Sequence, residues 1–253
     1  MTHIEATDIV HRFGDNTVLD GISLSVRPGE AVGIVGPNGA GKTTLLKVLA
    51  GLLRPDAGAV SLDGDDLQQL TRRQIAARIA VVPQATPQVF DYTVLEFVLM
   101  GRYTRSSRFV PGDDDIAAGR AALEQLQLTA LSHRSVSRIS GGELQRALIA
   151  RAAVSAAPMW LLDEPTASLD VCHRATVLER MRQHVHNGGA ALAVLHDLEL
   201  VHRYFDRVLP LCDARLLADG SPDQVLTESL VSRMYGVAMR RGTIGDHVVW
   251  VAD

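Results

Sequence analysis

Cysteine is scarce in this sequence: only Cys172 and Cys212 occur among 253 residues. Two isolated thiols form neither a disulfide framework nor a metal-ligand spacing, so they exclude a small disulfide-stabilised fold and a zinc finger. A basic excess is also missing, because the formal net charge is −4. This balance argues against a dedicated nucleic-acid binder, and we expect no nucleic-acid partner.

Long hydrophobic runs are missing too. No stretch of about 18 apolar residues occurs, and even the apolar segment 147–162 contains Arg151 and Pro158. The first residues, MTHIEATDIV, have neither a basic region nor an apolar run, which predicts no signal peptide. We therefore expect a cytoplasmic chain that has a membrane role only through a partner.

The composition and the apolar pattern predict an α/β fold. Hydrophobic residues make up 47% of the chain and charged residues 21%, which suffices for one large domain or a core with a subdomain. A block of helical pattern interrupts an alternation of strands and helices, and this order is typical of an α/β core with a helical insertion. We predict strands at 4–13, 18–26, 30–36, 58–64, 80–84, 159–164, 191–197 and 207–211, and helices at 42–51, 72–79, 93–102, 114–128, 141–154 and 175–185.

These elements predict one domain over 1–253. Its α/β core spans 1–85 and 156–235, and the helical insertion spans 86–155. A C-terminal extension, 236–253, follows a short helix from about Thr227 and contains the strand-like segment DHVVWVA.

The segment GPNGAGKT, residues 36–43, fits the pattern G-x-x-x-x-G-K-[ST] between a predicted strand and a predicted helix. In such a loop glycines let main-chain N–H groups surround phosphates, while Lys42 approaches the phosphates and the Thr43 hydroxyl faces Mg²⁺. The predicted nucleotide contacts are Gly36, Pro37, Asn38, Gly39, Ala40, Gly41, Lys42, Thr43 and Thr44.

Two acids end the predicted strand MWLLDE. Alone, such a pair is more often a helix N-cap. After a phosphate loop, the C-terminal end of a strand is where an α/β sheet binds its ligand. Asp163 then suits the Mg²⁺ shell, and Glu164 suits the polarising of a water that attacks the γ-phosphate.

Three single residues have two interpretations each. Gln84 and His196 end predicted strands of the same sheet, where they would face the phosphates, although an isolated Gln or His is usually structural. Phe13 would stack on a nucleobase or belong to the core.

A second glycine-rich helix start lies about a hundred residues further on. The segment RISGGELQRALIARA, 138–152, places Ser140, Gly141 and Gly142 directly before a predicted helix. This arrangement suits anion capture, and it also suits an ordinary helix cap. The cap alone does not explain two adjacent glycines.

The motifs GPNGAGKTT, VVPQ, ISGGE, MWLLDEP, SLD and LHD, in this order, resemble the nucleotide-binding subunit of ABC transporters over about residues 3–235. The resemblance implies a P-loop NTPase core with a mostly parallel sheet, an antiparallel β subdomain and an inserted α-helical subdomain. It also implies ATP and Mg²⁺ as cofactors and a dimer of two copies. In that dimer Ser140, Gly141, Gly142 and Glu143 of one copy would face the ATP of the other.

The same resemblance assigns single roles. Phe13 would stack on adenine, Gln84 would touch Mg²⁺ or water, Asp170 would couple the two sites, and His196 would contact the γ-phosphate. The catalytic set would then be Glu164, His196, Lys42 and Gln84, and the metal set Thr43, Gln84 and Asp163. Ile139 and Glu143 stand where the family commonly has Leu and Gln.

The segment ATPQVFDYTVLEFVLMGRYTR, 85–105, resembles importers of iron–siderophore complexes, haem and cobalamin. This implies separate transmembrane permease subunits, a substrate-binding protein and a position on the inner face of the cell membrane. The alternative is a soluble ABC ATPase in iron–sulfur assembly or another non-transport process. A small-molecule kinase would leave the segment SGGE and His196 without a role.

Overall fold

The structure of the chain is a computed structural model that describes residues 2–84, 91–104 and 111–253. Its centre is a mostly parallel sheet with the strand order β10-β9-β3-β8-β7-β6, in which β10 alone runs antiparallel to its neighbour. The strands β3, β7 and β8 are buried along their whole length, as expected for a parallel sheet covered on both faces. The strands are β3 Ala31–Val35, β6 Ile79–Val82, β7 Met159–Asp163, β8 Ala190–Val194, β9 Arg207–Cys212 and β10 Arg215–Leu216.

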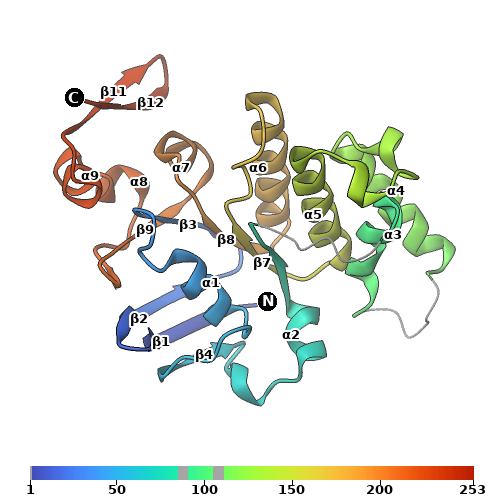
Figure 1. Cartoon of the computed structure of the whole chain (residues 1–253), viewed down its shortest axis with the longest axis horizontal. Coiled ribbons are helices and arrows are strands. Elements are labelled where there is room, and N and C mark those ends of the chain that lie inside the picture. Colours follow the sequence, from blue (N-terminus) through green and yellow to red (C-terminus); the bar gives the residue numbers. More distant parts are fainter. Residues whose placement is uncertain (1, 85–90, 105–110) are drawn as a thin grey trace.

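A second sheet, antiparallel throughout, has the order β2-β1-β4-β5. Its buried side chains, such as Ile4 and Ile9, share one hydrophobic core with Leu45 and Leu49 of α1 and with one face of the parallel sheet. Figure 1 shows α1 between the two sheets. These elements are β1 Ile4–Phe13, β2 Asn16–Val26, β4 Ala57–Leu62, β5 Asp65–Asp66, α1 Lys42–Leu49 and α2 Arg72–Arg78.

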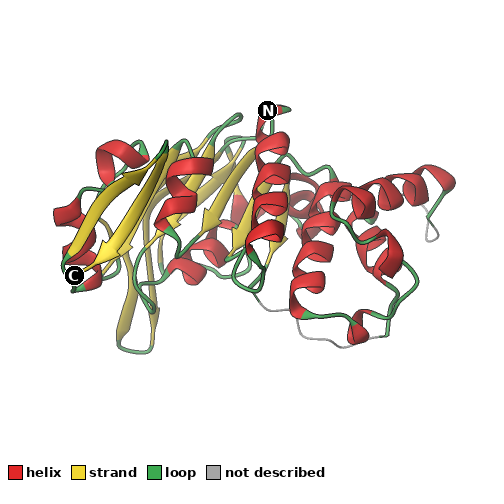
Figure 2. Cartoon of the chain, turned by 90° about the horizontal axis from the view of Figure 1, so that it is seen from above, coloured by secondary structure: helices red, strands yellow, loops and turns green. Residues whose placement is uncertain are grey.

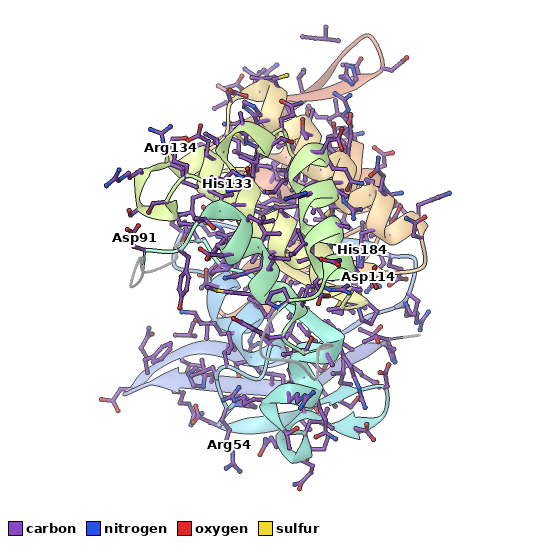
Figure 3. All side chains as sticks on the ribbon, turned by 90° about the vertical axis from the view of Figure 1, so that its right-hand side faces the viewer. Arg54, Asp91, Asp114, His133, Arg134 and His184 are labelled. Carbon is purple, nitrogen blue, oxygen red and sulfur yellow. The ribbon has the colours of Figure 1, made fainter. Side chains whose placement is uncertain are left out.

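The helical part lies to one side of the sheets (Figure 2). Its helices pack on one another and share a core with the other face of the parallel sheet, through residues such as Phe97, Leu123 and Leu148. The helices are α3 Val94–Leu99, α4 Asp113–Gln125 and α5 Gly141–Ser155, with α6 Val171–His186 between them and the rest of the core. Viewed from this side, Asp91 and Arg134 lie toward the left, His133 nearer the middle and Asp114 right of centre, while Arg54 lies below the helical part (Figure 3).

The predicted insertion 86–155 and the other subdomain limits remain predictions, and its first residues lie outside the described part of the chain, as does Arg105. Within the described residues, no helix is both long enough and apolar enough to span a membrane.

The C-terminal part contains one strand that the sequence did not indicate. The predicted strand in DHVVWVA exists as β12, and it pairs with β11 in a separate antiparallel hairpin. The segment MRRGTI has charged residues and a glycine instead of an apolar alternation, so only the pairing with β12 makes it a strand. The elements of this part are α7 Leu198–Tyr204, α8 Pro222–Val225, α9 Glu228–Tyr235, β11 Met239–Ile244 and β12 His247–Ala252.

Several predicted boundaries are wrong. The strand β6 ends at Val82, because Pro83 has no N–H for the ladder, so Gln84 lies beyond the strand. The strand β8 ends at Val194, which leaves His196 in the connection to α7. The helix predicted at 93–102 is α-helical only to Leu99, and a 3₁₀ turn, Met100–Arg102, continues it.

Candidate nucleotide site

The phosphate-loop segment connects β3 to α1 and has the conformation that its glycines predict. Gly41 has a φ of 99°, in the left-handed region, and a Cβ there would lie 2.5 Å from the main-chain oxygen of Val18. At Gly36 a Cβ would collide with the main-chain oxygen of Leu211. Only glycine fits at both positions, because main-chain atoms of β2 and β9 lie directly against the loop.

Lys42 begins α1 and is buried. Its Nζ donates to the carbonyl oxygens of Gly36 and Pro37, each at 2.8 Å. Burial lowers the pKa of Lys42, and the carboxylates of Glu164 and Asp163 act in the opposite direction. The ammonium group therefore lies inside the curve of the loop, next to negative charge.

Thr43 and Asp163 form a pair of oxygen donors beneath the loop. The Thr43 hydroxyl donates to Oδ1 of Asp163 at 3.1 Å, and Asp163 is buried at the end of β7. Burial raises the pKa of Asp163, while the bond from Thr43 opposes that shift. A buried carboxylate beside a hydroxyl and a second acid is a donor set that suits a hard divalent cation.

The Glu164 side chain contacts two others, those of Gln84 and His196, and the three residues follow the ends of three different strands. It has a left-handed φ of 49°, and its main-chain N–H donates to the Val194 oxygen of β8 at 3.1 Å. Its carboxylate accepts from Nε2 of Gln84 at 2.8 Å and lies 2.6 Å from Nε2 of His196. The structure thus brings together the three residues that the sequence placed at separate strands, although all three lie past the ends of β6, β7 and β8.

These groups surround a cavity of about 400 Å³, the size of a small-ligand site. Its walls are Val18, Asn38, Gly39, Gly41, Lys42, Thr43, Thr44, Gln84 and Glu164. Val18 was not predicted, since an apolar residue in a strand carries no signal of a site. Of the other predicted contacts, Ala40 is buried, and Gly36 and Pro37 accept the bonds from Lys42.

Phe13 ends β1 near the same loop. The residue is 56% exposed, and it does not line the cavity. The ring makes an edge-to-face contact with His11, with 4.8 Å between the ring centroids. The ring is therefore an exposed aromatic surface and not a core residue.

The second glycine-rich helix start is α5, and it has different surroundings. The Ser140 N–H donates to Glu143 at 2.7 Å, and Oγ of Ser140 accepts from the Glu143 N–H at 3.3 Å. This capping box lowers the pKa of Glu143, mainly through the Ser140 N–H. A Cβ on Gly142 would lie 2.9 Å from the Ser168 oxygen, whereas Gly141 has open space.

Asp170 is the N-cap of α6, and its side chain is 65% exposed. It accepts from the main-chain N–H of His173 and lies 2.9 Å from Nδ1 of the same residue. These bonds lower the pKa of Asp170. His173 was not among the predicted residues, although its spacing of three residues after an N-cap is a signal for such a pair.

The structure therefore separates the predicted residues into two sets. Lys42, Thr43, Gln84, Asp163, Glu164 and His196 form one connected group, whereas Ser140, Glu143 and Asp170 lie outside the cavity. Among the described residues no cluster of three His, Cys, Asp or Glu side chains could hold a metal ion by itself. A cation at Thr43 and Asp163 would need further oxygen ligands, such as phosphates.

Comparisons with known proteins agree with this geometry. The sequence pattern of the ABC transporter family matches residues 19–167. The hemin import ATP-binding protein of Myxococcus xanthus is 43% identical, over 90% of this chain and 87% of its own length. The cobalamin import ATP-binding protein of Halobacterium salinarum is 40% identical over 95% of this chain, which spans 60% of that relative's length.

Solved structures give the same result. A chain of an ABC transporter described as of the metal-chelate type, in an inward-facing conformation, superposes with a TM-score of 0.84. It is 26% identical, and the match covers 100% of this chain and 98% of the other. The ADP conformation of an ATP-binding cassette of an ABC transporter, also 26% identical, has a TM-score of 0.81 and covers 93% and 98%. With its phosphate loop, its second glycine-rich helix start and the acids at the sheet edge, the chain belongs to the ABC transporter family.

Proposed function

We propose that this chain binds and hydrolyses ATP and that it energises an importer of a metal chelate. The observation that supports hydrolysis best is Glu164. Its carboxylate lies at the wall of the cavity that Lys42 and Thr43 line, and Gln84 and His196 fix both of its oxygens. This is where a base must lie to orient water toward a phosphate held by the loop.

The loop and Lys42 would bind the phosphates. Main-chain N–H groups at the start of α1 and the ammonium of Lys42 together offer positive charge to the β- and γ-phosphates. In the structure Lys42 donates to two carbonyl groups of the loop, at 2.8 Å each. A phosphate that replaces those carbonyls would form a charge-assisted bond, which is the stronger kind.

The residues that would hold Mg²⁺ are Thr43, Asp163 and Gln84: the Thr43 hydroxyl bonds Asp163, and Thr43 and Gln84 line the cavity. When bound there, the ion would neutralise charge on the β- and γ-phosphate oxygens. Asp163 is buried with its pKa raised, so a cation would relieve the unfavourable burial of its negative charge.

Glu164 would accept a hydrogen bond from the attacking water. The carboxylate must exchange part of its bond to Gln84 or His196 for this purpose. His196, freed from Glu164, would then be available to donate to the γ-phosphate. The protein would act mainly by positioning and by charge stabilisation.

The open helix start at Ser140 would complete the site of a second copy. Gly141 and the Ser140 hydroxyl are exposed, and none of the cavity walls belongs to α5. A helix start with two glycines offers free main-chain donors to an anion. We propose that these donors bind the γ-phosphate of ATP held by a second copy and that Asp170 lies at the interface between the two copies.

The relatives named as hemin and cobalamin import proteins, and the structure described as of the metal-chelate type, favour an importer. We propose that the chain acts on the inner face of the cell membrane with two permease subunits and a substrate-binding protein. The cargo would be a ferric siderophore, haem or cobalamin. The contact with the permease would use the region around 85–105, of which 85–90 and Arg105 lie outside the described residues.

The enzymatic proposal is tested with Glu164→Gln. We expect phosphate release to fall about 1,000-fold, because the base that orients water is lost, while ATP binding persists and a dimer accumulates in size-exclusion chromatography with ATP and Mg²⁺. Glu124→Gln, at an exposed residue of α4, is the control and should behave as wild type. Unchanged hydrolysis by Glu164→Gln would contradict the role of this carboxylate.

The transport proposal is tested by capture of partners. Tagged Glu164→Gln with ATP and Mg²⁺ is incubated with detergent-solubilised membranes of the source cell, and retained proteins are identified by mass spectrometry. We expect a polytopic permease. Retention of soluble iron–sulfur assembly proteins alone would favour the non-transport alternative and contradict the importer.

A further inference from the structure

The exposed ring of Phe13 has a neighbour that the proposed function leaves without a role. His11 lies two residues earlier in β1, and its ring contacts the ring of Phe13. The two rings are nearly perpendicular, with an interplanar angle of 86° and 4.8 Å between their centroids. This is the edge-to-face geometry that aromatic pairs prefer.

His11 is a buried polar side chain. Only 8% of its side chain is exposed, and neither ring nitrogen has a hydrogen-bond partner among the described residues. The Asp56 carboxylate lies 3.6 Å from Nδ1, which is too far for a good hydrogen bond, and it accepts instead from the main-chain N–H of Arg12 at 2.7 Å. A buried polar group without a partner lowers stability, so the fold alone does not account for a histidine here.

The backbone around His11 is also irregular. The register of β1 with β2 shifts between Ile9 and His11 and again between His11 and Arg12. Such bulges occur next to functional sites, where they change the direction of a side chain. On the other strand the irregular stretch contains Val18, which lines the nucleotide cavity and touches the phosphate loop at Gly41.

We propose that His11 is a positioning residue for nucleotide binding, because its buried imidazole holds the Phe13 ring in the orientation that stacks on the base of ATP. This inference rests on the proposed ATP binding, together with the stacking role that the family resemblance gives to Phe13, and deepens it. His11 does not touch the nucleotide. It restricts the rotation of an exposed ring before the ligand arrives, and such pre-organisation raises affinity because less freedom is lost on binding.

The proposal separates affinity from stability. His11→Leu removes the imidazole and its two unpartnered nitrogens but keeps an apolar group of similar size. Since no hydrogen bond of His11 is lost, removing its unpartnered nitrogens should offset the loss of the ring contact, and the variant should unfold at about the same temperature. A residue with only a structural role would instead show lower stability and unchanged ATP affinity.

The experiment is a double-mutant cycle on ATP affinity, measured by isothermal titration calorimetry with wild type, His11→Leu, Phe13→Ala and the double variant. We expect Phe13→Ala to weaken ATP binding about tenfold, the size of one lost stacking contact. His11→Leu should weaken it about threefold, the size of a lost aromatic pair. In the Phe13→Ala background the change at His11 should have no further effect.

Three controls make the result specific. Inorganic tripolyphosphate, which lacks a base, should bind all four proteins equally. His11→Phe, which restores an aromatic edge, should bind ATP as wild type does. His3→Leu, at a histidine just before β1 that also has a buried unpartnered nitrogen, should leave ATP affinity unchanged.

Two results would overturn the inference while the proposed function stands. One is that His11→Leu weakens ATP binding equally with and without Phe13. The other is that wild type binds ATP but Phe13→Ala has no effect. If wild type bound neither ATP nor tripolyphosphate, the proposed function itself would fail.

Discussion

The two glycine-rich helix starts of this chain look alike in sequence but differ in their surroundings. At α1 the glycines are enclosed: Gly41 has a left-handed φ, and main-chain oxygens of Val18 and Leu211 leave no room for a Cβ at Gly41 and Gly36. At α5 a Cβ on Gly142 would lie 2.9 Å from the main-chain oxygen of Ser168, but Gly141 is exposed, its Cβ would meet nothing closer than 3.9 Å, and the helix begins with an ordinary capping box. The start of α1 is enclosed by main-chain atoms of β2 and β9, whereas the start of α5 has an exposed glycine.

The charged and polar residues around the two helix starts also differ. Around α1 lie a buried lysine, a buried aspartate, and Glu164 with its two hydrogen-bond partners. The cavity walls include no residue of α5 or its N-cap. Figure 1 shows the two helices in different parts of the molecule, with β7, β8 and α6 between them. The start of α5 offers main-chain N–H donors but does not share a cavity with a carboxylate that could orient water, as Glu164 could at α1. Such a helix start is suited to complete a site that belongs to another copy.

Among the variants that test the difference between the two helix starts, we expect the largest change in ATP hydrolysis from a substitution of Ser140. In Ser140→Arg a long cation occupies the position that we assign to a phosphate of the second copy. Hydrolysis should fall about 100-fold, the size of the loss of a preorganised donor, while ATP binding by the single chain stays unchanged. Phosphate release and ATP titration measure the two quantities. The same change at exposed Ser229, in the first turn of α9, should affect neither.

Lys42→Ala, unlike Ser140→Arg, should weaken the binding of ATP by the single chain. It removes the charged donor inside the loop, so ATP binding itself should weaken about tenfold or more. Titration with ATP measures this, and Lys47→Ala, at the exposed lysine one turn later in α1, is the matched control. ATP affinity unaffected by Lys42→Ala would place the phosphates elsewhere.

The two sets of glycines should also differ in stability. Gly41→Ala forces a Cβ into a left-handed residue beside the Val18 oxygen, which should lower the free energy of unfolding by about 1–3 kcal/mol. Gly141→Ala meets nothing closer than 3.9 Å and should have almost no effect. Denaturation with urea compares the variants. Equal losses would show that both helix starts are equally constrained.

The smallest expected effect concerns Asp163. Burial raises its folded-state pKa above the unfolded value, so its negative charge lowers stability at neutral pH, and this penalty fades as the pH falls through the folded-state pKa. Asp163→Asn should therefore raise the melting temperature slightly at pH 7 without nucleotide, and the difference should shrink in acid. Scanning calorimetry at several pH values tests this, and a lower melting temperature at pH 7 would contradict it.

Much of the fold was predictable because its signals are local. The apolar strands, the loop 36–43 and the capped helix at Gly141 each follow from the residues in one short stretch. The strand β11 was not predictable, since MRRGTI becomes a strand only through its pairing with β12. The start of α6 at Val171, before the predicted 175, depends on the cap that Asp170 forms with His173.

For the site, residue types were predictable and distances were not. The sequence pointed to Gln84, Glu164 and His196, but their meeting at 2.8 Å and 2.6 Å depends on the left-handed Glu164 and on strands β6 and β8, which end two and three residues earlier than predicted. Val18 and His11 carry no local signal, because their positions matter only through contacts with other elements.

The central claim is that each ATP site needs two copies, and mixing two inactive chains tests it most directly. Lys42→Ala keeps the helix start at Ser140 intact, and Ser140→Arg keeps the phosphate loop intact. In a mixed dimer, the loop of the second variant would meet the helix start of the first and form one complete site. We expect the mixture to release phosphate much faster than either variant does alone. If the two variants form mixed dimers, detected with two different tags, and hydrolysis stays as slow as in the separate variants, the claim that the site is shared between copies is wrong.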